Sequence, residues 1–119
     1  MIRWCLRGPL FENWVVGEIL KARLHRGLPS RAYFLRDRKG FEIDLLLDVG
    51  DRLIATEIKS ARTVAGGFFA NLERLLRSPP DALAGRDIEP RIVYGGSQRQ
   101  RRRGTAVVPW NEMHDLEWW

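Results

Sequence analysis

The chain has 119 residues, of which 45% are hydrophobic and 29% are charged, and its formal net charge is +5. This length and balance predict one folded domain and exclude a disordered tail. The positive charge favours polyanionic partners, although an ordinary solvated surface has the same balance. The single cysteine excludes a disulfide framework and a thiolate metal site.

Membrane insertion and one common mode of nucleotide binding are also excluded by the sequence. No apolar run approaches the length of a membrane-spanning helix, and the N-terminus has no signal-peptide pattern. We therefore expect a cytoplasmic protein that does not associate with a membrane. No glycine-rich phosphate loop ending in Lys-Ser or Lys-Thr occurs, which excludes ATP binding by that route.

The first predicted element is a helix that opens at Gly8-Pro9 and runs to about Arg26, before Gly27-Leu28-Pro29. Its apolar residues form one broad stripe, with Glu12 near the middle and Glu18 toward the polar border. A carboxylate on a buried face is costly without a partner, which makes Glu12 a candidate functional acid. The alternative is that Glu12 complements the positive end of the helix and leans into solvent.

Three strands are predicted next, over residues 31–36, 41–47 and 53–59. A second helix follows over about residues 68–77, and its apolar face is expected to pack on the sheet. Two short strands end the pattern, over residues 91–94 and 106–110. This α-β-β-β-α-β-β order predicts an α/β (α+β) fold, in which helices flank a central mixed sheet of about five strands.

Acidic residues occur in the second and third strands at positions where a buried strand is normally apolar. Because side chains alternate faces along a strand, Glu57 and Lys59 share a face. If Gly50 and Asp51 form a two-residue hairpin loop, Asp44 lies directly opposite Glu57. Two opposed carboxylates repel one another unless a cation lies between them. The sequence therefore indicates a shared site of Asp44, Glu57 and Lys59, and the alternative is an exposed hairpin face with ordinary salt bridges.

Such a site would suit Mg²⁺ or Mn²⁺, since Mg²⁺ binds a few carboxylates and keeps several waters for a phosphate substrate to replace. A bound metal would polarise a scissile phosphate and lower the pKa of a water molecule. Lys59 would orient or deprotonate that water and stabilise the charge that develops on the phosphate. Glu12 could add a third carboxylate from the first helix. The predicted reaction is hydrolysis of phosphodiester bonds in DNA.

The most basic run of the chain contains Arg99, Arg101, Arg102 and Arg103. These arginines could contact the phosphates of a bound duplex without reading its sequence, and the alternative is a solvated hairpin tip. The terminal Trp118-Trp119 pair is not expected to be fully exposed, which suggests a partner surface or a missing continuation. A second copy of the chain is one candidate partner.

Several motifs resemble one family in their order and spacing. They are Gly8-Pro-Leu-Phe-Glu12-Asn-Trp-Val, Tyr33-Phe-Leu-Arg-Asp37, Gly40-Phe-Glu-Ile-Asp44, Glu57-Ile-Lys-Ser60, Val93-Tyr-Gly-Gly96 and Val108-Pro-Trp110. The chain resembles the domain of unknown function, family 4143, at the C-terminus of predicted prokaryotic AAA-type ATPases. That domain is similar to the PD-(D/E)XK nuclease superfamily, which includes restriction endonucleases and archaeal Holliday-junction resolvases.

The resemblance implies a restriction-endonuclease-like core and a role for each candidate residue. Glu12 would be the helix acid, Asp44 the hairpin metal ligand, and Glu57 and Lys59 the Glu-x-Lys pair. Ile43-Asp44 stands where the name-giving Pro-Asp pair occurs in the superfamily. The resemblance also implies that residues 1–119 are one nuclease-like domain of a longer protein, with an AAA-type ATPase module in the same or a separate chain.

A non-catalytic role is the second interpretation of the same pattern. The domain would then keep the nuclease fold as a module that binds DNA or protein and regulates the ATPase.

Overall fold

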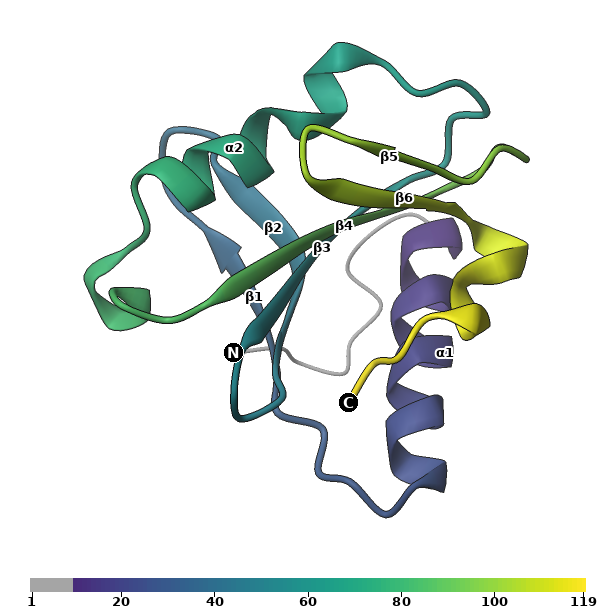
Figure 1. Ribbon diagram of the computed structural model, residues 1–119, viewed down its shortest axis with the longest axis horizontal. Helices are drawn as coiled ribbons and strands as arrows, with labels where there is room; N and C mark the ends of the chain where they lie inside the picture. The colour runs from purple at the N-terminus through teal and green to yellow at the C-terminus, as the bar shows by residue number, and fades with distance from the viewer. Residues whose placement is uncertain (1–9) are drawn as a thin grey trace.

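The computed structural model describes residues 10–119, so the predicted helix start at Gly8-Pro9 lies outside the described residues. Over this range the chain forms one sheet with helices on both faces (Figure 1). The elements are α1 (Leu10–His25), β1 (Ala32–Arg36), β2 (Glu42–Asp48), β3 (Leu53–Lys59), η1 (Gly66–Phe69), α2 (Ala70–Arg77), η2 (Asp81–Leu83), β4 (Ile88–Tyr94), β5 (Gln100–Arg102), β6 (Thr105–Pro109) and η3 (Trp110–Asp115), where η denotes a short 3₁₀ helix.

The sheet is mixed, and its strand order is β1-β2-β3-β4-β6-β5. The strands β1, β2 and β3 are joined as antiparallel neighbours, β3, β4 and β6 run parallel, and β5 is antiparallel to β6. Lys59 pairs with Tyr94, and Tyr94 pairs with Pro109, so the three parallel strands end together at one edge of the sheet. In open sheets of this kind, ligands commonly bind beyond the carboxyl ends of the strands.

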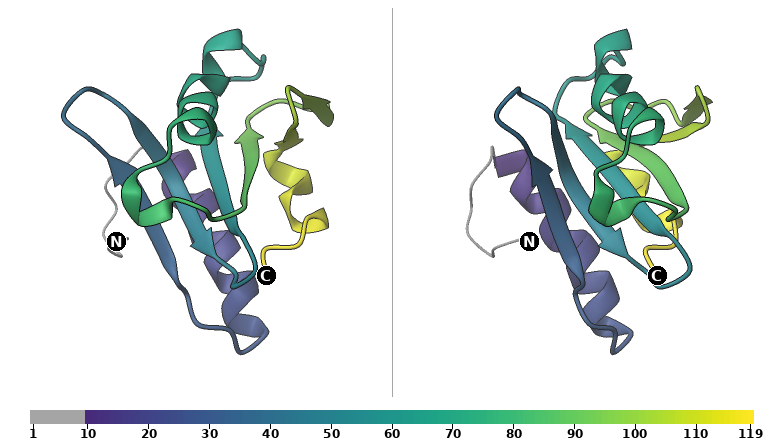
Figure 2. Two further views of the ribbon diagram at one scale, coloured as in Figure 1. Left: turned by 60° about the vertical axis from the view of Figure 1, so that its left-hand side comes forward. Right: turned by 90° about the vertical axis from the view of Figure 1, so that its left-hand side faces the viewer.

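Two apolar clusters form the core of the described residues, one on each face of the sheet. Figure 2 shows α1 and α2 on these opposite faces. The first lies under α1 and the C-terminal segment and contains Val15, Ile19, Leu20, Ala32, Leu45, Leu47, Ile54, Ile58, Val93, Val108, Met113 and Trp118. The second lies under η1 and α2 and contains Phe41, Ile43, Leu46, Leu53, Ala55, Phe69, Leu72, Leu75, Ile92, Tyr94 and Val107. Alternation of side chains along β3 divides its apolar residues between the two clusters.

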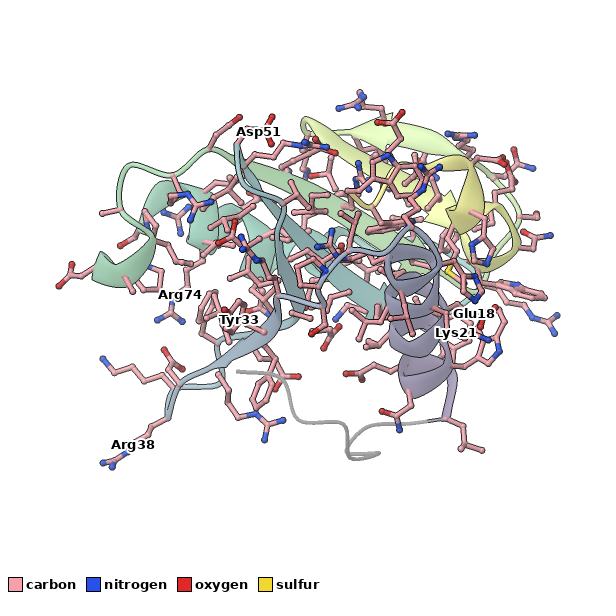
Figure 3. The ribbon with its side chains drawn as sticks, turned by 90° about the horizontal axis from the view of Figure 1, so that it is seen from below. Glu18, Lys21, Tyr33, Arg38, Asp51 and Arg74 are labelled. Carbon is pink, nitrogen blue, oxygen red and sulfur yellow. The ribbon has the colours of Figure 1, made fainter. Side chains whose placement is uncertain are left out.

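The helix α1 buries the apolar stripe that its sequence predicts. Val15 and Ile19 are fully buried against the sheet. Glu18 and Lys21 form an ion pair on the polar border, and Figure 3 shows both side chains on the side of α1 that faces away from the sheet. Arg23 is buried at the other end of the helix, where it donates hydrogen bonds to the carbonyl oxygens of Pro29 and Trp118. Because one of these acceptors belongs to Trp118, Arg23 links the C-terminal segment to α1.

The α+β class is confirmed, but the sheet has six strands where the sequence predicts about five. The additional strand is β5, which lies in the basic run and pairs with β6. Its Gln-Arg-Arg sequence has no apolar alternation, because it forms an edge strand with little buried surface. β4 also begins at Ile88, three residues before the predicted start, and Pro90 lies within it.

The terminal tryptophans pack against the same chain. Trp118 is 1% exposed, and its indole N–H donates a hydrogen bond to the carbonyl oxygen of Met113 at 2.9 Å. The guanidinium of Arg26 lies 3.5 Å from the ring centre of Trp119. The pair is therefore not fully exposed, as the sequence predicts, and Trp118 completes the core under α1, while a partner surface at this pair stays a prediction. Among the described residues, no helix is long and apolar enough to cross a membrane.

Candidate functional site

The hairpin of β2 and β3 has the register that its two-residue loop predicts. The N–H of Val49 donates to the carbonyl oxygen of Arg52 at 3.1 Å, and Leu45 pairs with Thr56. Continuing this register by one residue places Asp44 opposite Glu57. The two candidate acids therefore face each other at the point where the regular pairing of β2 with β3 ends.

The pairing of β1 with β2 is irregular beside Asp44. In the pairing of β1 with β2, Tyr33 faces Leu46 but Leu35 faces Ile43, so one residue of β1 spans two residues of β2. Asp44 is one of these two extra-register residues. A bulge of this kind redirects a side chain and locally interrupts a ladder, and bulges are frequent beside active sites. The sequence gives no direct sign of this bulge.

The two carboxylates accept hydrogen bonds from the backbone of the opposite strand. The N–H of Ile58 donates to Oδ2 of Asp44 at 2.8 Å, and the N–H of Asp44 donates to Oε1 of Glu57 at 3.1 Å. On α2, Nδ2 of Asn71 lies 3.4 Å from Oε2 of Glu57. Nζ of Lys59 also lies 3.4 Å from this oxygen. The structure thus brings Asp44, Glu57 and Lys59 together and adds Asn71, which sequence reasoning missed.

Burial and mutual repulsion disfavour the charged form of both acids. Burial raises the pKa of Asp44, although the Ile58 N–H and the charge of Lys59 oppose this shift. Burial and then the charge of Asp44 raise the pKa of Glu57 to about 7, against the opposing effects of Lys59 and Asn71. The side chain of Glu57 is 1% exposed. At neutral pH this pair therefore retains part of a proton, a state typical of functional sites.

Lys59 is positioned by contacts on both its side chain and its backbone. Its Nζ lies 5.7 Å from the ring centre of Phe68, and its side chain is 31% exposed. The N–H of Gly95 donates to the carbonyl oxygens of Lys59 and Ala61, both at 3.0 Å. A Cβ atom at Gly95 would lie only 2.2 Å from the carbonyl oxygen of Ser60. Glycine is therefore required at position 95 for the chain that leaves β4 to approach the backbone of Lys59. The Tyr-Gly-Gly motif is the sign of this close approach in the sequence.

Glu12 lies in the first turn of α1, on the sheet-facing stripe one turn before fully buried Val15. This helix covers the face of the sheet opposite to Asn71, and its first residues lie beside Ser60 at the Lys59 end of β3. Over residues 10–119 no group of three or more His, Cys, Asp or Glu side chains is placed to hold a metal ion. The contribution of Glu12 to the site therefore stays a prediction.

Comparison with known families agrees with this arrangement of motifs. The family described as "Domain of unknown function (DUF4143)" matches residues 7–113. The chain belongs to this family. No curated protein and no solved structure matches the chain. The matched span of this DUF4143 domain includes Glu12, Asp44, Glu57 and Lys59.

The arginine run of the DUF4143 domain is divided among several contacts. Arg103 forms an ion pair with Glu73 at 2.7 Å, and Arg99 lies 3.5 Å from Asp115. The guanidinium groups of Arg102 and Arg103 lie 5.3 and 5.2 Å from the ring centre of Phe69. These two arginines thus lie beside η1, whose Phe68 contacts Lys59. Their predicted contact with DNA remains a prediction.

The donor atoms of the candidate site are of the type that a hard divalent cation prefers. Both acids offer carboxylate oxygens, which are the ligands that Mg²⁺ and Mn²⁺ prefer. Each carboxylate oxygen has two lone pairs, so the backbone hydrogen bonds to Asp44 and Glu57 leave room for a cation. A cation would also relieve the repulsion that raises the pKa of Glu57.

Proposed function

We propose that this domain is a metal-dependent nuclease-like hydrolase that acts on DNA in the cytoplasm. The observation that carries the proposal is the facing pair of half-buried Asp44 and fully buried Glu57 with Lys59 beside it. A pair of acids that repel one another inside a protein lowers its stability, so a structural role alone explains the pair poorly. A divalent cation would turn the same repulsion into a source of affinity.

The residues of the site would divide the work of phosphodiester hydrolysis. Asp44 and Glu57 would hold the cation, and Asn71 would fix the orientation of the Glu57 carboxyl group. When bound, Mg²⁺ would polarise the phosphate and lower the pKa of a water molecule. The Lys59 ammonium would donate a hydrogen bond to a phosphate oxygen and stabilise its growing charge. Attack of water on phosphorus breaks the bond to the leaving oxygen and yields a phosphate monoester and a hydroxyl end.

A second function is supported by the hydrogen bonds of the same two acids. Asp44 and Glu57 each accept a backbone N–H of the opposite strand, so they could serve only to join β2 to β3. In that case the domain would be a catalytically inactive module that binds DNA or protein and regulates an AAA-type ATPase. The facing of the two acids favours the enzyme, because joining two strands does not require a second carboxylate that repels the first.

Nicking of supercoiled plasmid DNA separates the two functions. We expect nicking in Mg²⁺ or Mn²⁺, and a loss of at least about a hundredfold in Lys59→Ala and Asp44→Ala. Lys39→Ala is the matched control, because Lys39 is an exposed lysine in the turn between β1 and β2. Circular dichroism would show that each variant is folded. Nicking that persists in both site variants would refute the assignment, and a folded wild type without nicking would favour the inactive module.

A further inference from the structure

A pocket of about 460 Å³ lies where the three parallel strands end. Ser60 follows β3, Gly95 follows β4 and Trp110 follows β6, so each strand delivers one residue to its wall. The first turns of α1 complete the wall with Leu10, Phe11 and Trp14. Lys59 immediately precedes Ser60 in the chain. The pocket therefore begins one residue from the candidate catalytic lysine.

The pocket presents aromatic surface to solvent. Trp14 is 45% exposed and Trp110 is 41% exposed. Their rings meet edge to face, with centroids 5.8 Å apart and planes inclined by 71°. This geometry leaves ring faces available for a flat aromatic ligand. Neither tryptophan belongs to the apolar clusters of the core.

We propose that this pocket binds an unpaired nucleobase of the strand whose phosphate lies at Lys59. The identity of the ligand as nucleic acid rests on the proposed function. Side chains alternate at the end of β3, so Lys59 points toward α2 and the pocket lies on the α1 side. A strand that crosses this edge of the sheet would place a phosphate at Lys59 and the adjoining base against the exposed ring face of one tryptophan.

Charged side chains surround the pocket, which suits a charged strand better than an apolar protein segment. Arg62 is exposed on the loop that follows Ser60, and Arg99 lies on the loop that follows Gly95. The acids of the surrounding elements include Glu12 in α1 and Glu112 and Asp115 in η3, and Asp115 lies 3.5 Å from Arg99. Stacking on aromatic side chains tolerates any base, because every base has a π-face. The substrate is therefore single-stranded or locally unpaired DNA, since a paired base cannot enter the pocket.

Binding to a thymidine 12-mer and to an abasic 12-mer tests the pocket directly. The full chain is titrated in EDTA, which prevents cleavage, and binding is followed by fluorescence anisotropy of a labelled end. We expect wild type to bind the thymidine strand about tenfold more tightly than the abasic strand. Trp110→Ala and Trp14→Ala should each lose most of this difference while binding the abasic strand as wild type does.

Two further variants serve as controls. Leu24→Ala removes an apolar side chain that is 68% exposed near the far end of α1, and it should keep the preference for bases. Trp110→Phe keeps an aromatic face, and it should retain much of the preference. If Trp110→Ala is poorly folded, the Trp14→Ala and Trp110→Phe pair still decides the result.

Equal binding of both strands by wild type would overturn the proposal. So would an unchanged base preference in the two alanine variants, and the pocket would then be left to a protein partner. Plasmid nicking in Mg²⁺ on the same samples keeps this outcome apart from the proposed function. A base preference without nicking supports the pocket and rejects the nuclease. Nicking without a base preference supports the nuclease and rejects the pocket.

Discussion

Two glutamates on neighbouring parallel strands have opposite electrostatic surroundings. Glu89, near the start of β4, accepts hydrogen bonds from Arg52 at 3.0 Å and from Arg91 at 2.7 Å. Burial alone would raise the pKa of Glu89, but the two arginines outweigh it and lower the pKa below its ordinary value. Glu57, near the end of β3, faces another acid, and burial and Asp44 raise its pKa to about 7.

The parallel strands β3 and β4 thus have a Glu89 end and a Glu57 end, and the difference shows that the Glu89 end is the one arranged for stability. At the Glu89 end Arg52, Glu89 and Arg91 are paired with one another, and Arg91 also donates to the carbonyl oxygen of Glu117 at 2.7 Å and lies over the ring of Trp118. At the Glu57 end, Lys59 is the one cation of residues 10–119 that lies within ion-pair distance of either acid. Selection commonly tolerates such a local loss of stability where a site must bind or react. The comparison can be tested by changing one acid at each end.

Metal affinity should give the largest difference between the two ends. We expect Mn²⁺ to bind the wild type and Asp44→Asn to weaken that binding by about a hundredfold, because the variant removes one of two charged ligands. Glu89→Gln should leave the affinity unchanged. Isothermal titration calorimetry at millimolar metal measures all three.

Proton release provides an internal check on the metal site. Because Glu57 retains part of a proton near pH 7, metal binding should release protons, and the observed heat should depend on the ionisation enthalpy of the buffer. Binding that is unaffected by Asp44→Asn and independent of the buffer would place the metal elsewhere.

The stability of the protein should fall as the pH rises past the ordinary pKa of Glu57. The folded-state pKa of about 7 lies above the ordinary value of 4.5. Between these two values the folded chain binds more protons than the unfolded chain, so the free energy of unfolding decreases as the pH rises. The decrease from this group is on the order of 3 kcal/mol and is nearly complete by about pH 8. Asp44, whose pKa is also raised, acts in the same direction.

Urea denaturation at pH 5, 6, 7 and 8 measures this slope. Glu57→Gln should flatten this slope, since glutamine still has an oxygen to accept the Asp44 N–H but does not titrate. Glu89→Gln should leave the slope above pH 5 unchanged, because the lowered pKa of Glu89 places its own effect at more acidic pH. Equal slopes in wild type and Glu57→Gln would show that Glu57 is ionised throughout.

Much of the fold and part of the site could be predicted from the sequence. The period-two pattern and the Val49-Gly50-Asp51-Arg52 turn determine the register of β2 and β3, so the opposition of Asp44 and Glu57 followed from counting residues. The period of α1 placed Glu12 on the sheet-facing stripe and Glu18 outside it. These features depend on residues close together in the chain, so the spacing of those residues predicts them directly.

The remaining features depend on contacts between segments far apart in the chain. The bulge at Asp44 exists only relative to β1, and Asn71 reaches Glu57 only after α2 has packed on the sheet. The strand β5 has no apolar pattern because it lies at the edge of the sheet and buries little surface. Arg23 in the core was also missed, since its acceptors are backbone oxygens of Pro29 and Trp118 that no side-chain pattern reveals.

Stability at pH 8 should change in opposite directions at the two ends, and this is the smallest of the expected effects. Glu89→Gln leaves the guanidinium of Arg91, which is 6% exposed, without its anionic partner. We expect a loss of about 1–2 kcal/mol, between the values of surface and buried ion pairs. Asp44→Asn removes the repulsion with Glu57 and keeps an oxygen to accept the Ile58 N–H, so we expect no loss or a gain of about 1 kcal/mol. Urea midpoints of the two variants and wild type give both signs, and a comparable loss in both variants would mean that the two ends are stabilised in the same way.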